Sequence, residues 1–220
     1  MITVIGDCHG KFDQYYNIAS KCEYSIVIGD FGFSSAWNKL SYSKLDSNKH
    51  KVILGNHEDY DVAPNIPHCL GDYGIHTLNG ITFFFVRGGI SIDRVYRVGE
   101  ELNGSPKTWW SQEELDFAQM TNCLALYKAT KPDIVLSHVP PTIFIDRIHG
   151  NKDNNILQKF KFHSGFRENT SQLGTMMLNS LEDHFPKLWI SGHHHKSYQE
   201  DFGQFKFVSL AELETYEITL

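Results

Sequence analysis

The stretch that decides the fold is Ile2-Thr3-Val4-Ile5-Gly6-Asp7-Cys8-His9-Gly10. Its first four residues are all β-branched, which predicts a short buried β-strand. Directly after this strand, between two glycines, come Asp7 and His9, whose side chains are of the types that bind metal ions. In α/β sheets, binding sites form outside the carboxyl ends of the strands. Residues 2–10 therefore predict a strand with candidate metal ligands at its carboxyl end.

The same design recurs four times further along the chain. A short apolar run leads each time to histidine, carboxylate or amide side chains: Gly29-Asp30 after residues 24–28, Gly55-Asn56-His57-Glu58 after 51–54, Ser137-His138 after 133–136, and Gly192-His193-His194-His195 after 187–190. Because parallel strands of one sheet end at the same edge, these side chains are expected to meet at one rim. One such motif alone is usually an ordinary turn, but the ordered series predicts a cation site with several ligands.

The first third of the chain alternates strands with helices. Strands at 2–5, 24–28 and 51–54 are separated by helices predicted near 11–22 and 35–48, and this alternation implies parallel pairing. Antiparallel strands are expected in the later parts of the chain. The predicted fold class is therefore a mixture of α/β and α+β: two packed mixed β-sheets, a sandwich flanked by helices in four layers.

The rest of the chain gives weaker signals. Asn79-Gly80 lies between two apolar runs and predicts an antiparallel hairpin. Residues 111–114, Ser-Gln-Glu-Glu, have the pattern of a capping box that would open a helix ending before Pro132. After Pro140-Pro141, an irregular basic stretch is expected as far as Glu168, either as a substrate loop or as a solvated loop. The last predicted elements are a helix over 170–185 and antiparallel strands at 205–210 and 215–220.

Composition excludes several classes of protein. The 220 residues suit one domain, residues 1–220, and the net charge of −6 argues against broad non-specific binding to nucleic acid, although a local basic groove stays open. No apolar run approaches the roughly 18 residues that a membrane span needs. The first motif leaves no room for a signal peptide, and the four cysteines show no Cys-x-x-Cys spacing. Free thiols and a cytoplasmic location are expected.

The ligand types narrow the choice of metal. Asp, Asn and His together suit cations of intermediate softness, most of all Mn²⁺, with Fe, Zn and Mg as alternatives. A carboxylate such as Asp30 can bridge two cations about 3.5–4 Å apart. The number of candidate ligands is about right for two divalent ions. Cys8 could act as a soft ligand, but alternation in an extended turn would point it away from its neighbours.

The whole series of motifs, from Gly6 to His195, resembles the calcineurin-like metallophosphoesterase superfamily. The resemblance implies a two-sheet sandwich with helices outside. It also implies one metal held by Asp7, His9 and His195, a second held by Asn56, His138 and His193, and Asp30 bridging the two. In this interpretation His57 and Asp30 contribute to catalysis, His57 and Asn56 face the substrate, and His194 is a bystander. Glu58 would either orient His57 through a hydrogen bond or be an ordinary solvated or capping carboxylate.

One motif departs from the family's pattern. In the Ser/Thr protein phosphatase branch the second motif continues to Val-Asp-Arg-Gly, whereas here Gly29-Asp30 is followed by Phe-Gly-Phe. The arginine that would hold the phosphate is missing. The stretch is instead similar to a bacterial and phage branch of the superfamily. If the gene is carried by a phage, the expected location is the cytoplasm of the host. Arg94 or Arg97, beyond the Gly88-Gly89 pair, could supply the contact, or could be surface residues.

The expected reaction is hydrolysis of a phosphoester by a metal-activated water. The expected substrates are small or nucleotide-type phosphoesters, and nucleic acid or a phosphoprotein remain possible partners. One alternative is a protein phosphatase of the phage or bacterial type, since Gly55-Asn56-His57-Glu58 is typical of that branch. A second alternative is a metal-binding scaffold without turnover, but degenerate scaffolds usually lose ligands and none is missing here.

Overall fold

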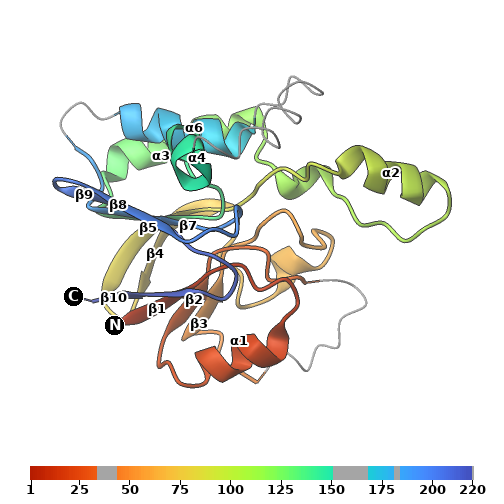
Figure 1. The fold of residues 1–220 in the computed structure, drawn as a ribbon, viewed down its shortest axis with the longest axis horizontal. Coiled ribbons are helices and arrows are strands. Elements are labelled where there is room, and N and C mark those ends of the chain that lie inside the picture. The colour runs from red at the N-terminus through yellow and green to blue at the C-terminus, as the bar shows by residue number, and fades with distance from the viewer. Residues whose placement is uncertain (34–43, 151–167, 181–183, 220) are drawn as a thin grey trace.

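The structure is a computed structural model, and it describes residues 1–33, 44–150, 168–180 and 184–219. Two β-sheets lie face to face (Figure 1). The smaller sheet has the strand order β10-β1-β2-β3, formed by Thr215–Ile218, Ile2–Ile5, Ser25–Val27 and His50–Val52. The larger has the order β4-β5-β6-β7-β9-β8, formed by Tyr73–Leu78, Ile81–Val86, Ile134–Ser137, Leu188–Ser191, Phe205–Ser209 and Tyr198–Phe202. This is the predicted sandwich of two mixed sheets.

The sheets are held together by apolar side chains that face each other. Val4 and Ile26 of the small sheet belong to the same buried cluster as Phe83 and Phe85 of β5. The side chain between those two, Phe84, points to the opposite face and packs under the helices. Strand β5 is therefore apolar on both faces, which is why its sequence is a continuous apolar run. Burial of each such side chain contributes about 1.5–3 kcal/mol.

Helices cover the outer faces of both sheets (Figure 1). Helices α3 (Phe117–Thr130), α4 (Thr142–His149) and α6 (Asn169–Asn179) lie over the six-stranded sheet, and α1 (Phe12–Ala19) lies under the four-stranded sheet. Helix α2 (Arg94–Leu102) projects from the body and buries none of its residues. No helix in the described part of the chain is long and apolar enough to cross a membrane.

The topology brings the predicted motifs to one rim. Strands β1, β2 and β3 are parallel to one another, and so are β5, β6, β7 and β9. The backbone N–H of Gly192, after β7, donates to the carbonyl of His138, after β6, at 2.9 Å. In the other sheet, the N–H of His9, after β1, donates to the carbonyl of Asp30, after β2, at 2.6 Å. The segments that follow neighbouring strands are thus tied to each other.

Several local predictions are confirmed and others are wrong. Asn79 and Gly80 both have positive φ, 48° and 75°, as a tight hairpin turn requires, and β4 pairs antiparallel with β5. The capping box at 111–114 is wrong. Helix α3 begins later, at Phe117, with Asp116 and Gln119 as the reciprocal pair. The reason is that Glu114 Oε1 accepts a hydrogen bond from the N–H of Asn169 at 2.9 Å instead of capping a helix.

Helices α4 and α6 also differ from the prediction. Helix α4 forms within the stretch expected to be irregular, because Phe144 and Ile148, one turn apart, are both buried in the core under the helices. Helix α6 ends at Asn179, earlier than predicted. Most of the helix predicted over 35–48, and most of the basic stretch up to Glu168, lie outside the described residues.

Candidate metal centre

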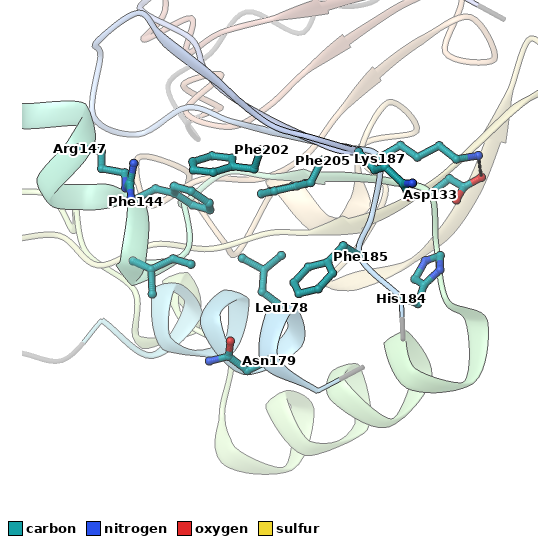
Figure 2. Close-up of a pocket in the computed structure, with 12 residues that line it drawn as sticks. Asp133, Phe144, Arg147, Leu178, Asn179, His184, Phe185, Lys187, Phe202 and Phe205 are labelled. Carbon is teal, nitrogen blue, oxygen red and sulfur yellow. Dashed lines mark hydrogen bonds and ion pairs between the residues drawn. The ribbon is translucent and has the colours of Figure 1, made fainter. Parts of the chain in front are cut away.

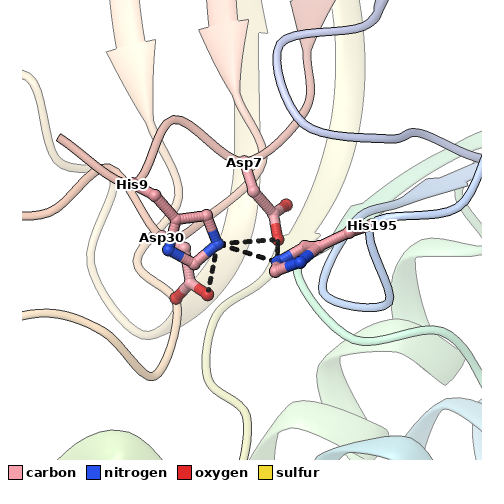
Figure 3. Close-up of side chains that lie close together, drawn as sticks. All are labelled: Asp7, His9, Asp30 and His195. Carbon is pink, nitrogen blue, oxygen red and sulfur yellow. Dashed lines mark hydrogen bonds and ion pairs between the residues drawn. The ribbon is translucent and has the colours of Figure 1, made fainter. Parts of the chain in front are cut away.

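Four side chains from three strand ends meet in a first group of candidate ligands (Figure 3). Asp7, His9, Asp30 and His195 each offer one ligand atom, and these atoms all lie within 4.8 Å of one another. The Nε2 atoms of His9 and His195 are 2.7 Å apart, and His195 Nε2 is 3.1 Å from Asp7 Oδ2. His9 Nε2 is 3.6 Å from Asp30 Oδ2. Segments separated by more than 180 residues thus converge on one point.

A second group lies beside the first and shares Asp30 with it. It consists of Asp30, His138 and His193, again with ligand atoms within 4.8 Å of one another. His138 Nε2 is 3.4 Å from Asp30 Oδ1 and 3.1 Å from His193 Nδ1. The same nitrogen is 3.2 Å from Asn56 Oδ1, so the Asn56 oxygen also faces this group. Asp30 uses its two oxygens in different directions, one toward each group.

The backbone around both groups is held in an unusual conformation. Seven described residues other than glycine have positive φ, and four of these are His9, Asp30, His193 and His195. Such a conformation costs about 1–3 kcal/mol for each residue and is concentrated at functional sites in proteins. The ring of strand ends is therefore built to point these side chains inward, at a cost to stability.

Two glycines make room for the carboxylates. A Cβ atom on Gly55 would lie 2.1 Å from Asp30 Oδ1, and one on Gly192 would lie 2.1 Å from Asp7 Oδ1. No side chain can be accommodated at either distance. Gly55 and Gly192 therefore have a steric role, because the backbone at each of them passes directly over a buried carboxylate.

The electrostatics of the cluster fit cations. Burial alone would raise the pKa of Asp30, but His138 and other nearby imidazoles lower it. Conversely, burial alone would lower the pKa of His138, but Asp30 and Asp7 raise it. The buried carboxylates therefore need protonated imidazoles beside them to balance their charge. The donors, carboxylate, imidazole and amide oxygen, are those that divalent cations use, and a bound cation would take the place of these protons.

His57 lies at the open side of the cluster, beside an arginine. Its exposed ring is 5.1 Å from the ring of His9. The backbone N–H of His57 donates to Asp30 Oδ1 at 2.9 Å. Arg97 Nη2, from α2, lies 3.2 Å from His57 Nδ1. Arg97 is held in turn by Asp93, at 2.9 Å. Desolvation lowers the pKa of His57, and although Asp30 opposes this, Arg97 adds to it.

The sequence is also similar to those of known proteins. The sequence profile described as calcineurin-like phosphoesterase matches residues 1–197. The chain belongs to that family. A lariat debranching enzyme from Entamoeba histolytica is 24% identical over an alignment of 254 residues. The alignment covers 96% of this chain and 68% of the relative. The chain is thus a calcineurin-like phosphoesterase, a hydrolase of phosphoester bonds from a family that uses divalent metals.

Solved structures show weaker likeness. A putative 5'-nucleotidase from Staphylococcus aureus, crystallised with alpha-ketoglutarate, has a TM-score of 0.48 and 15% identity, over 96% of this chain and 48% of that one. The phosphopantetheinyl hydrolase PptH from Mycobacterium tuberculosis has a TM-score of 0.44 and 14% identity, over 96% of this chain and 89% of that one.

Of the two arginines proposed from the sequence, Arg97 contacts His57, and Arg94 lies near Glu114. Burial raises the pKa of Glu114, and Arg94 lies close enough to that carboxyl to oppose the rise. Of the Gly88-Gly89 pair, Gly89 lies against the candidate ligands, because a Cβ there would be 3.1 Å from Asn56 Oδ1.

Glu58 has neither of the roles suggested by the sequence. It is buried, and its two oxygens accept hydrogen bonds from the N–H groups of Phe31, Gly32 and Phe33 at 2.6, 3.1 and 2.7 Å. Burial and the nearby Asp30 carboxylate raise its pKa to about 8, although these hydrogen bonds oppose the rise. Glu58 therefore fixes the backbone that follows Asp30, and it does not orient His57.

Two further residues of the motifs lie outside both groups. Cys8 is buried among apolar side chains, and its pKa is raised to about 12, first by burial, which makes a thiolate ligand unfavourable at neutral pH. His194 Nδ1 lies 3.0 Å from His149 Nε2 of α4. The two neighbours of His194 belong to the two groups of candidate ligands, while its own ring points toward α4.

The side chains that contact the candidate ligands from behind were not predicted from the sequence. His193 uses Nδ1 toward His138, and its Nε2 lies 3.3 Å from Glu168 Oε1. Asn56 Nδ2 donates to Ser91 Oγ at 3.2 Å, and Ser91 Oγ donates to Glu113 at 2.6 Å. None of Glu168, Ser91 and Glu113 belongs to one of the ligand motifs. Only their positions in space connect them to the centre.

A separate apolar pocket lies at the opposite edge of the six-stranded sheet (Figure 2). Asp133 and Lys187, which line it, precede β6 and β7, whereas the candidate ligands follow these strands. Its volume is about 520 Å³, and Phe144, Phe202 and Phe205 form part of its wall. None of the predicted site residues lines it. This pocket is therefore distinct from the ligand cluster.

Proposed function

We propose that this chain hydrolyses phosphodiesters, of small or nucleotide type, at a centre of two divalent cations, with Mn²⁺ as the expected metal. The observation that supports this most directly is the position of Asp30 in both groups of candidate ligands. In this proposal Asp7, His9 and His195 hold one cation, Asn56, His138 and His193 hold the other, and Asp30 bridges them.

The cations would polarise the phosphoryl oxygens, lower the pKa of the attacking water and neutralise the charge that develops in the reaction. The protein supplies orientation. Asp7, Asp30 and His138 are buried, so their geometry is fixed before any substrate arrives. The open side of the cluster, where His57 and His195 are exposed, is the direction from which a phosphoester would enter.

His57 would act on the leaving oxygen. An arginine can only donate hydrogen bonds, so the contact from Arg97 makes His57 Nδ1 an acceptor and leaves the proton of the neutral ring on Nε2. From there it can donate a hydrogen bond to the oxygen on which negative charge develops as the bond to phosphorus breaks. The lowered pKa of His57 agrees with a neutral ring.

A comparison of substrates tests the proposed function. With Mn²⁺ added, kcat/KM for a chromogenic phosphodiester should exceed that for a phosphoserine peptide, because a diester carries one charge fewer and depends less on the arginine that the second motif lacks. The similarity to a lariat debranching enzyme also favours a nucleotide-type phosphoester. A clear preference for the phosphopeptide would favour a protein phosphatase, and no turnover of either substrate would favour a scaffold.

Arg97→Ala should lower kcat/KM for the phosphodiester by roughly 10- to 150-fold, since a charge-assisted hydrogen bond is worth about 1.5–3 kcal/mol. Arg97 is largely shielded from solvent, with its side chain 15% exposed, so screening weakens this contact little. Arg94→Ala is the matched comparison on the same helix and should cost much less. Steady-state kinetics of both variants would contradict the assignment if Arg94→Ala proved the more damaging.

A further inference from the structure

We infer that Ser91 and Glu113 set the orientation of the Asn56 side-chain amide, and so determine whether its oxygen or its nitrogen faces the metal centre. The inference rests on the proposed function, in which the Asn56 oxygen binds one of the two cations. Neither Ser91 nor Glu113 belongs to one of the ligand motifs, and both are buried. They are positioning residues, since they act on the centre only through Asn56.

The argument begins with the single proton of the Ser91 hydroxyl. Ser91 Oγ donates this proton to Glu113 Oε2, at 2.6 Å. Having no second proton, it can only accept from Asn56, whose Nδ2 lies 3.2 Å away. The amide nitrogen is therefore directed toward Ser91, and the oxygen faces the opposite way, 3.2 Å from His138 Nε2.

Glu113 is held as an acceptor on both of its oxygens. Oε1 accepts from the N–H of Ser91 at 2.8 Å and from Trp109 Nε1 at 2.9 Å, and Oε2 accepts from the Ser91 hydroxyl. Burial raises the pKa of Glu113, but the hydrogen bonds from Ser91 and Trp109 oppose the rise, and with donors on both oxygens the carboxyl group acts as an acceptor. The direction of every hydrogen bond from Glu113 to Asn56 is thereby fixed.

The backbone keeps the three residues in register. The N–H of Gly89 donates to the carbonyl of Glu113 at 3.1 Å, which ties the segment after β5 to the turn that carries Glu113. A Cβ on Gly89 would approach Asn56 Oδ1 to 3.1 Å, so this segment packs directly against the Asn56 amide. An amide that turned around would present N–H groups to the cation and would lose a ligand.

Glu113→Gln reverses the direction of the chain of hydrogen bonds with little change in shape. The Gln oxygen, in the place of Oε1, still accepts from Ser91 N–H and Trp109. The Gln amide nitrogen, in the place of Oε2, donates to Ser91 Oγ, which then turns its own proton toward Asn56, where the side-chain amide, at 3.2 Å, is nearer than the backbone carbonyl, at 3.5 Å. Asn56 must rotate its amide to accept it. Mn²⁺ affinity at one of the two sites, measured by titration calorimetry, should fall by about 10- to 100-fold.

The decisive measurement repeats Glu113→Gln in an N56D background. A carboxylate at position 56 can accept from Ser91 with one oxygen and offer the other to the cation, so the reversed hydrogen bond suits it. E113Q should therefore weaken Mn²⁺ binding in the wild-type background and leave it unchanged or stronger in the N56D background. Comparing E113Q within each background cancels the effect of the extra charge of N56D. A merely structural role of Glu113 would weaken binding in both.

Removal of the hydroxyl provides an independent control. Ser91→Ala should weaken Mn²⁺ binding at one site, because the Asn56 amide loses its partner. Ser209→Ala removes another buried hydroxyl, one without a hydrogen-bond partner among the described residues, and should leave Mn²⁺ binding unchanged. Thermal unfolding of each variant shows whether it is folded. If Ser91→Ala does not fold, the pair of E113Q measurements still decides.

The outcomes separate this inference from the proposed function. If the wild-type protein binds two Mn²⁺ ions and hydrolyses the phosphodiester, but E113Q changes Mn²⁺ affinity equally in both backgrounds or in neither, the inference is wrong and the proposed function stands. If the wild-type protein does not bind two ions, the proposed function itself is wrong and the inference falls with it. A loss in the wild-type background alone supports both.

Discussion

In the proposed two-cation centre, Asp30→Asn should deprive the protein of both ions and reduce the proposed phosphodiester hydrolysis by more than about 10⁴-fold, the upper end of what a single acid–base group contributes. The side chain keeps its shape, but only one oxygen remains, and a bridge between two cations needs two. Asp30 is the one residue shared by both groups of candidate ligands. Metal analysis after purification with Mn²⁺, together with kcat/KM, measures the two effects in one preparation.

Glu58→Gln is the matched control for the loss of a buried carboxylate. Glu58 lies behind the same loop as Asp30 but belongs to neither group of candidate ligands, and the Gln oxygen can still accept from two of the three backbone N–H groups that Glu58 binds. This variant should retain both Mn²⁺ ions. If Asp30→Asn kept two ions and wild-type turnover, or if Glu58→Gln lost metal as severely, the bridging role of Asp30 would be wrong.

The rim of ligands could be predicted from the sequence because each motif is local. A β-branched run predicts a strand, and the side chains that follow it must lie at the carboxyl end of that strand. Once β1, β2 and β3, and likewise β6 and β7, are parallel, the convergence of Asp7, Asp30 and His138 follows from the topology. The sequence needs to specify only the order of the strands.

The side chains behind the ligands could not be predicted, because their partners are distant in sequence and their residue types are ordinary. Glu58 accepts hydrogen bonds from backbone groups 25 to 27 residues away, and Glu113 from Ser91, 22 residues away. A buried carboxylate with several donors and a solvated one have the same letter in the sequence. The capping box failed for this reason: Glu113 and Glu114 are used in tertiary contacts, which outweigh a local pattern.

In helix α4, too, tertiary packing outweighs the local preference of the sequence. Its sequence, Thr-Ile-Phe-Ile-Asp-Arg-Ile-His, is rich in β-branched residues that lower helix propensity. Phe144 and Ile148 nevertheless lie four residues apart, so a helix places both on the face that packs on the sheet. Phe144 stacks on Phe207 of β9, with ring centroids 4.0 Å apart. Packing against the core decides the conformation here.

His57→Ala should reduce turnover of the phosphodiester by about 10²–10⁴-fold while the protein retains its metal ions. The ring of His57 lies at the open side of the cluster and belongs to neither group of candidate ligands. Its backbone N–H, which survives the substitution, is the group that contacts Asp30. Metal content and kcat must therefore separate in this variant, and equal loss of metal in His57→Ala and Asp30→Asn would show that the division of roles is wrong.

A second substitution identifies what the His57 ring contributes. His57→Gln can place an N–H donor near the position of Nε2 but cannot act as an acid, so it should recover part of the activity lost in His57→Ala if hydrogen-bond donation to the leaving oxygen is the main effect. The loss in both variants should be smaller for a nitrophenol leaving group than for an alkyl alcohol, because a weakly basic oxygen needs less stabilisation. If the loss is the same for both leaving groups, His57 does not act on the leaving oxygen.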